Sequence, residues 1–141
     1  MSSRHLSLRL DPDTFDRLED RSRQSGQSRS ELARVLLDEG LRMEAHPGIV
    51  FRSGPAGRRP GLTGGPDVWE VVRVFQDMDT RGEEALRQLA ALTGLFPEQV
   101  SAAIRYYAEY RTEIDTWIHR VDEEAARSEA IYRRTRDLLD R

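Results

Sequence analysis

Three polar side chains alternate with three leucines in residues 5–10, which read His-Leu-Ser-Leu-Arg-Leu. Imidazole, hydroxyl and guanidinium groups all form directional hydrogen bonds, and a guanidinium can hold two acceptors at once. Successive side chains of a β-strand point to opposite faces, so a strand here would gather His5, Ser7 and Arg9 on one face. The pattern predicts a recognition surface for hydrogen-bonding edges.

This strand has no partner nearby in the sequence. Residues 1–44 predict one strand and two helices, a unit with almost no core and an unpaired strand edge. A second copy of the chain could supply the partner, paired antiparallel across a two-fold axis. Such a ribbon would present the polar face twice and would fit the DNA major groove. The predicted dimer core consists of Leu6, Leu8, Leu10, Phe15, Leu18, Leu32, Val35 and Leu36.

The two helices carry clear end signals. Asp11 followed by Pro12 is typical of a helix start, and Gly26 is typical of a helix end. Residues 28–31, Ser-Arg-Ser-Glu, form a capping-box pattern that would open the second helix. That helix is apolar on two sides, which indicates burial on two sides, as an intertwined dimer would provide.

Residues 5–10, the helix ending at Gly26 and residues 28–32 together resemble ribbon-helix-helix proteins of the CopG, Arc and MetJ kind. The resemblance covers about the first third of the chain. It implies that His5, Ser7 and Arg9 contact base edges, with Arg9 suited to guanine. It also implies phosphate contacts, which fix register rather than sequence. The expected phosphate-contacting residues are Arg4, Ser28, Arg29 and Ser30.

Charge and composition limit the remaining possibilities. Residues 1–44 contain eight arginines and nine acids, so a DNA-binding face requires the arginines to be sorted onto one side. We therefore expect modest non-specific affinity and a shallow salt dependence. The chain has no cysteine, which excludes disulfides and thiolate chemistry. Without a signal peptide or a long apolar run, the sequence predicts a soluble, cytoplasmic protein with no membrane partner.

The composition changes after Glu44. Residues 45–66 are rich in glycine, proline and arginine, and they predict either a β-hairpin or a semi-ordered linker. The apolar triplet Ile49-Val50-Phe51 favours the hairpin. Pro60 indicates that a returning strand would be an edge strand or broken.

Residues 67–121 predict a helical domain. Asp67 is a candidate helix cap, residues 80–83 form another capping-box pattern, and Gly94 would end a helix. A long helix is expected to begin at Pro97, with an apolar stripe that reaches Val121 and lapses once, at Arg111.

Residues 46–49 (His-Pro-Gly-Ile), the glycine-rich hairpin and residues 66–72 (Pro-Asp-Val-Trp-Glu-Val-Val) resemble a small domain of unknown function found in antitoxins. Those antitoxins are often encoded beside PIN-domain ribonuclease toxins. The resemblance covers residues 46–120 and implies a compact, homeodomain-like helical fold without catalytic residues. Residues 89–100 also fit a helix-turn-helix pattern, with Glu98, Gln99 and Ser101 near DNA, although a purely structural helical hairpin is favoured.

The last segment, residues 122–141, is charged and amphipathic. It could continue the preceding helix into solvent, or it could become ordered on a partner. In antitoxins of the kind that the chain resembles, the C-terminal part commonly blocks the toxin. The expected partner-binding residues are Trp117, Ile131, Tyr132, Leu138 and Leu139.

No catalytic, metal-binding or phosphate-loop pattern occurs, so we expect neither an enzyme nor a cofactor. The fold class expected is mainly α: a ribbon-helix-helix, then a small β-hairpin, then a homeodomain-like helical domain with a long C-terminal helix. The expected function is a homodimeric repressor that binds a palindromic operator in double-stranded DNA and serves as the antitoxin of a toxin such as a PIN-domain ribonuclease. The alternative is a stand-alone regulator whose C-terminal domain mediates oligomerisation or another protein contact.

Overall fold

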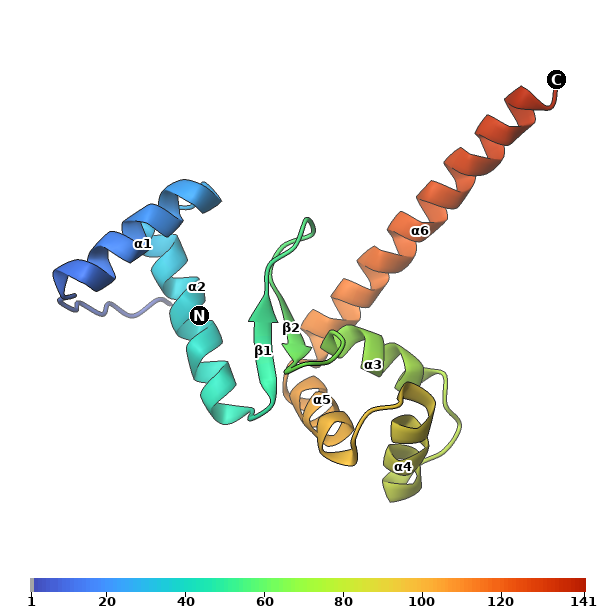
Figure 1. The fold of residues 1–141 in the computed structure, drawn as a ribbon, viewed down its shortest axis with the longest axis horizontal. Helices are drawn as coiled ribbons and strands as arrows, with labels where there is room; N and C mark the ends of the chain where they lie inside the picture. The colour runs from blue at the N-terminus through green and yellow to red at the C-terminus, as the bar shows by residue number, and fades with distance from the viewer. Residues whose placement is uncertain (1) are drawn as a thin grey trace. The chain divides into compact units, whose positions relative to one another are not determined.

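The computed structural model describes residues 2–141, which form six α-helices and one two-stranded antiparallel sheet (Figure 1). The expectation of a mainly helical chain with a small hairpin is thus confirmed. The chain forms two compact units, which divide between Glu44 and Ala45, the position at which its composition changes. We describe each unit separately.

In the first unit, residues 2–11 belong to neither a helix nor a strand. Helix α1 spans Pro12–Ser25 and helix α2 spans Arg29–Ala45. The predicted ends are confirmed, because Asp11 caps α1 through its side chain and Gly26 ends that helix with a left-handed φ of 72°. Gly26 suits this position because a side chain would be strained there.

The second unit begins with the β-hairpin, which confirms the hairpin over the linker interpretation. Strand β1, Ile49–Arg52, pairs antiparallel with strand β2, Arg59–Leu62, so that Ile49 lies opposite Leu62 and Phe51 opposite Pro60. Ile49 and Leu62 are buried, and they attach the hairpin to the core of the unit.

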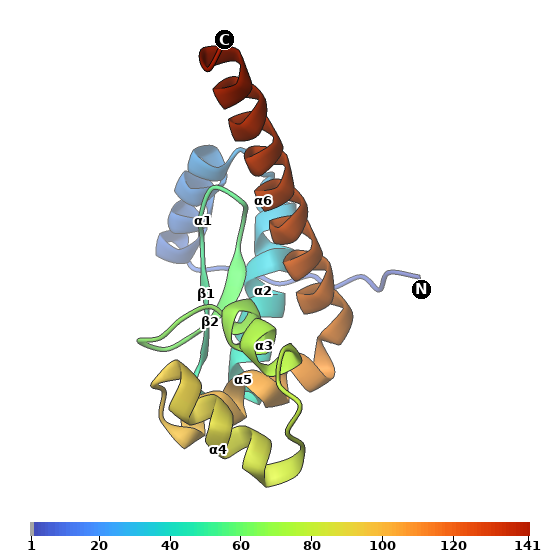
Figure 2. The same ribbon diagram turned by 90° about the vertical axis from the view of Figure 1, so that its right-hand side faces the viewer.

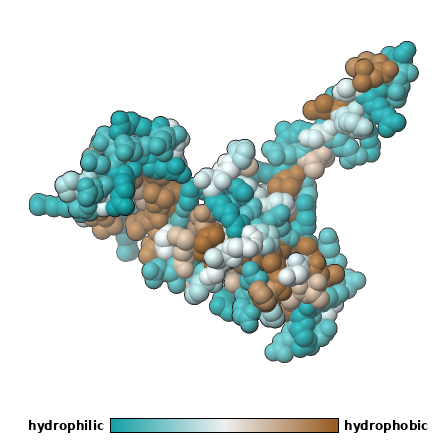
Figure 3. Space-filling model, viewed as in Figure 1, coloured by the Kyte–Doolittle hydropathy of each residue, from teal (hydrophilic) through white to brown (hydrophobic). Residues whose placement is uncertain are grey.

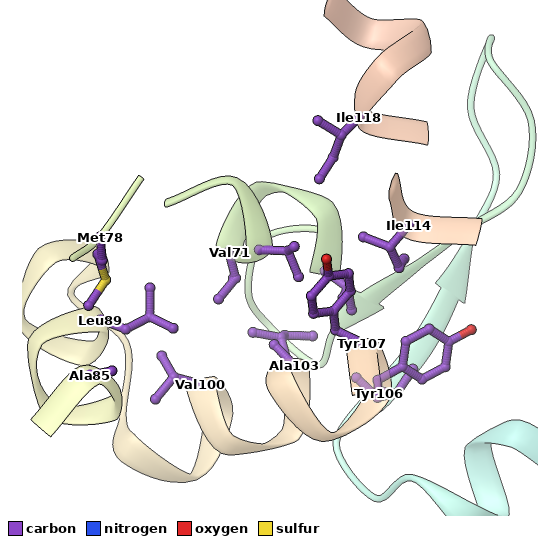
Figure 4. Close-up of a cluster of buried hydrophobic side chains, with 14 residues drawn as sticks. Val71, Met78, Ala85, Leu89, Val100, Ala103, Tyr106, Tyr107, Ile114 and Ile118 are labelled. Carbon is purple, nitrogen blue, oxygen red and sulfur yellow. The ribbon is translucent and has the colours of Figure 1, made fainter. Parts of the chain in front are cut away.

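Three helices complete the body of this unit: α3, Val68–Gln76; α4, Gly82–Thr93; and α5, Pro97–Glu109. Their apolar faces meet in one core, which Figure 4 shows. Asp67 begins α3, since the Asp67 N–H donates to Glu70 Oε2 (2.8 Å). Gly94 ends α4 as predicted, with a φ of 71°. The fully buried members of the core include Val68, Val72, Leu89, Val100, Ala103 and Tyr106.

Two local predictions are wrong. The long helix from Pro97 is interrupted at Tyr110 (φ −114°, ψ 40°), so the stripe that reaches Val121 belongs to two helices. The capping box at residues 80–83 does not form, because α4 begins at Gly82 and the Thr80 hydroxyl bonds to Gln88 instead. At residues 80–83 a competing hydrogen bond to a side chain of α4 itself replaces the expected cap.

Helix α6, Arg111–Leu139, starts against the core and then leaves it (Figures 1 and 2). Ile114 and Ile118 are buried and Val121 is half-buried. From Asp122 to Arg141 every residue is exposed except Ala130, which is half-buried. The segment 122–141 therefore continues the preceding helix instead of forming a separate element. Within residues 2–141, helices that could cross a lipid bilayer are absent.

Candidate nucleic-acid interface

The N-terminal segment displays both of its predicted faces to solvent. Leu6 and Leu8 are 67% and 62% exposed, and His5, Ser7 and Arg9 are exposed as well. The His5 Nε2 atom lies 2.7 Å from the Ser7 hydroxyl, so these two polar side chains lie on the same side of the backbone. This orientation fits an extended backbone, but residues 2–11 form no strand within the single chain, so the predicted strand stays a prediction.

The cap of α1 fixes where this segment ends. The Thr14 N–H donates to Asp11 Oδ2 (3.1 Å), and the Thr14 hydroxyl donates to Asp11 Oδ1 (2.6 Å). These hydrogen bonds, with that from the Thr14 side chain the largest cause, lower the pKa of the Asp11 carboxyl below its ordinary value. The Asp11 carboxylate thus holds the start of α1 in place immediately after the polar residues.

The capping box predicted at the start of α2 is present. The Glu31 N–H donates to the Ser28 hydroxyl (3.1 Å), and the Ser28 N–H donates to Glu31 Oε2 (3.4 Å), which confirms the capping box. The Arg29 guanidinium lies 5.1 Å from the centre of the Phe15 ring, so Arg29 also connects the two helices. Ser28, Arg29 and Ser30 are all exposed.

The predicted dimer-core residues divide into two groups. Leu32 is buried (3% exposed), while Leu18 and Val35 are half-buried. No residue of α1 between Pro12 and Ser25 is buried. The exposed members of the predicted dimer core are Leu6, Leu8, Leu10, Phe15 and Leu36.

The arginines of the first unit differ in their surroundings. Arg23 pairs with Asp20 (2.8 Å) and Arg42 with Asp38 (3.0 Å), so acids of the same helix offset these charges. Arg4 and Arg9 lie in the segment that precedes Asp11, the first acid of the chain. The N-terminal segment before Asp11 therefore carries two arginines and no acid, in a unit that is not basic overall.

A buried charge cluster in the second unit was not predicted. Asp67 is 7% exposed, and its carboxylate accepts from Arg52 Nη1 (2.9 Å) and from the Arg59 Nε–H. The Trp69 indole N–H lies 3.3 Å from the same carboxylate. Arg52 also donates to the Gly65 carbonyl (2.7 Å). The excess of arginine in the hairpin was the only sequence signal, and two of its three arginines, Arg52 and Arg59, form ion pairs with Asp67.

A second unpredicted pair involves His46, which is 5% exposed. Its Nε2 atom lies 2.6 Å from Glu109 Oε2, and its ring meets Tyr106 edge-on with centroids 5.2 Å apart. The pair connects the first residues of the second unit to the end of α5. The His-Pro-Gly sequence alone gives no indication of this, since Glu109 lies 63 positions away.

Polar side chains that line the hollow among α3, α5 and α6 form hydrogen bonds with one another. The Tyr107 hydroxyl donates to Asp115 Oδ1 (2.7 Å), and Gln76 Nε2 lies 3.2 Å from both groups. At the possible helix-turn-helix, the Gln99 side chain accepts from the Phe96 N–H (2.9 Å), so it closes the start of α5. Within residues 2–141, no group of three metal-ligating side chains is close enough to hold a metal ion.

The predicted partner-binding residues lie on α6. Trp117 is half-buried with the Arg120 guanidinium 4.9 Å from its ring centre, whereas the other four are between 61% and 80% exposed.

The comparisons with protein families, curated proteins and solved structures found no match to this chain.

Proposed function

We propose that this chain is a dimeric, sequence-specific DNA-binding repressor. The observation that supports this most strongly is the N-terminal segment, in which exposed leucines alternate with exposed His5, Ser7 and Arg9 directly before the capped helix α1. Exposing several large apolar side chains on one face of a short segment is unfavourable in water, and burial against a second copy removes that cost.

Pairing the two segments antiparallel buries the leucine face and presents the polar face in duplicate. The polar face then enters the major groove of a palindromic operator. The N-terminus of α2, with exposed Ser28, Arg29 and Ser30, contacts a backbone phosphate and fixes the position of the ribbon. His5 and Ser7 read base edges beside Arg9.

DNA binding is tested with fluorescence anisotropy on the fragment upstream of the chain's own gene. The Arg9→Ala substitution should reduce operator affinity by about 1–3 kcal/mol for each base that Arg9 reads. The matched control is Arg23→Ala, because Arg23 is an exposed arginine already paired with Asp20. Unchanged operator affinity in the Arg9 variant, with an intact dimer, would exclude base readout by this residue.

We further propose that the repressor is the antitoxin of a toxin–antitoxin pair. Support comes from the resemblance of residues 46–120 to the antitoxin-associated domain, and from α6, whose exposed apolar residues present a surface for a partner. The toxin, a nuclease of the PIN type, binds the second unit and α6, and its binding tunes operator occupancy. Co-purification of the chain with the product of the adjacent gene tests this. The antitoxin proposal is contradicted if the purified chain is monodisperse and does not bind that product at micromolar concentration.

A further inference from the structure

The second half of α6 has an apolar face that residues 2–141 leave uncovered. At 3.6 residues per turn, Ser128 and Thr135 lie between two columns of larger apolar side chains. Hydrophobic atoms stand out among hydrophilic ones near the C-terminal end of α6 in Figure 3. The two columns, 61–80% exposed, are Ile131 with Leu138, and Tyr132 with Leu139.

Charge is distributed unevenly along the same stretch. Residues 122–129 contain four acids and one arginine, whereas residues 130–141 contain four arginines and two aspartates. Some of these charges pair within the helix, as Glu129 does with Arg133 (2.5 Å). Such exposed pairs are weak and exchange readily, so the net charge of each half still determines how a second charged helix orients.

We propose that, in the absence of a toxin, this face pairs antiparallel with the same face of a second copy of the chain. Antiparallel pairing places the acidic half of each helix beside the basic half of the other. Parallel pairing would place acid on acid and arginine on arginine, which is repulsive. The proposal goes beyond the proposed function, since it concerns the chain without DNA or toxin.

The free length of α6 suits this arrangement. When the crossing point lies between Ile131 and Tyr132, position 128 of one copy faces position 135 of the other, and positions 123 and 140 mark the two ends of the paired stretch. The paired stretch of about 18 residues is about 27 Å long at 1.5 Å per residue. It ends just beyond Val121, where α6 joins the core, so the partner helix covers the exposed length and stops at the body of the unit.

The pairing should be reversible. The seam contains the small residues Ser128 and Thr135, which allow close approach but bury little apolar area, and Glu124 lies in the same column as Ile131 and Leu138. Exposed charge pairs set orientation more than affinity. A toxin that covers the same columns of apolar residues would therefore displace the second copy.

The orientation is tested by disulfide mapping, which the absence of native cysteine makes unambiguous. The double variant Ser128→Cys/Thr135→Cys is oxidised mildly, digested with trypsin at the intervening arginines and analysed by mass spectrometry. Seven residues along a helix span about 10.5 Å, too far for a disulfide within one chain. We expect links from position 128 to position 135. Links of 128 to 128 and 135 to 135 would overturn the antiparallel arrangement.

The interface itself is tested by analytical ultracentrifugation of the full chain. Ile131→Glu/Leu138→Glu should weaken self-association by at least about tenfold, because carboxylates placed in the seam lose hydration. The control is Asp137→Ala, on the opposite face of the helix. The double variant should remain a dimer if the N-terminal ribbon pairs and should be a monomer if it does not. Failure of the ribbon proposal is therefore distinguishable from failure of the α6 proposal. Equal self-association of the wild type and the double variant refutes the proposal.

Discussion

Asp67 serves several purposes in the second unit. Its carboxylate is buried, accepts hydrogen bonds from Arg52 and Arg59, and lies at the start of α3. Burying one carboxylate is costly unless its oxygens are satisfied, and the two guanidinium groups from the hairpin satisfy them. One residue thereby joins the hairpin to the helical body.

Substituting Asp67→Ala should destabilise the second unit by about 3 kcal/mol, because both arginines would lose their buried acceptor. The estimate is at the low end for buried pairs, since the arginine side chains are 31% and 26% exposed. Urea unfolding followed by tryptophan fluorescence measures the change in stability. The control Asp79→Asn removes the charge of an exposed aspartate and should change little.

The Asp11 cap makes the stability of α1 depend on pH. The folded-state pKa of Asp11 lies below its ordinary value of 3.8, so the stabilisation is complete above that value and is lost as the pH falls through the lowered pKa. Asp11→Ala should therefore reduce stability at neutral pH and lose its effect in strong acid. Circular dichroism melts at several pH values measure the difference. Asp13→Ala, which leaves the cap intact, should have the smaller effect.

At the scale of elements, the sequence predicts ends well where a few adjacent residues decide them. Asp11, Gly26 and the Ser28–Glu31 box mark helix ends through local hydrogen bonds, and all three are evident in the sequence. The break at Tyr110 could not be predicted in this way, because the lapse at Arg111 is a single position in an otherwise regular stripe. The Asp67 and His46 pairs were missed because their partners lie 8 to 63 positions away.

Helix α4 offers a direct test of which face supports the core. Leu89 is fully buried, whereas Leu92 in the same helix is 60% exposed. Leu89→Ala should cost about 2–5 kcal/mol through reduced burial and a cavity, and Leu92→Ala about 0.5 kcal/mol or less. Denaturant unfolding of both variants gives the comparison. Equal destabilisation would mean that α4 packs through a different face.

At the scale of the whole molecule, the two units should differ in how they respond to dilution. The second unit has its own core, whereas none of the α1 residues is buried within a single chain. Folding of the first unit is therefore expected to depend on dimerisation, and its stability on protein concentration.

The position of the tryptophans makes this difference measurable. Both, Trp69 and Trp117, belong to the second unit. On dilution below the dissociation constant of the proposed ribbon dimer, far-ultraviolet circular dichroism should lose the contribution of α1 and α2 while tryptophan fluorescence stays native. Simultaneous loss of both signals would indicate a single cooperative structure instead.

The departure of α6 from the core after Val121 separates two kinds of evolutionary constraint. Substitutions before that point must preserve a packed interior, whereas those after it alter only the exposed surface of the helix. The amino-acid sequence of this projecting arm is therefore free to diverge without any change in the packed body of the unit.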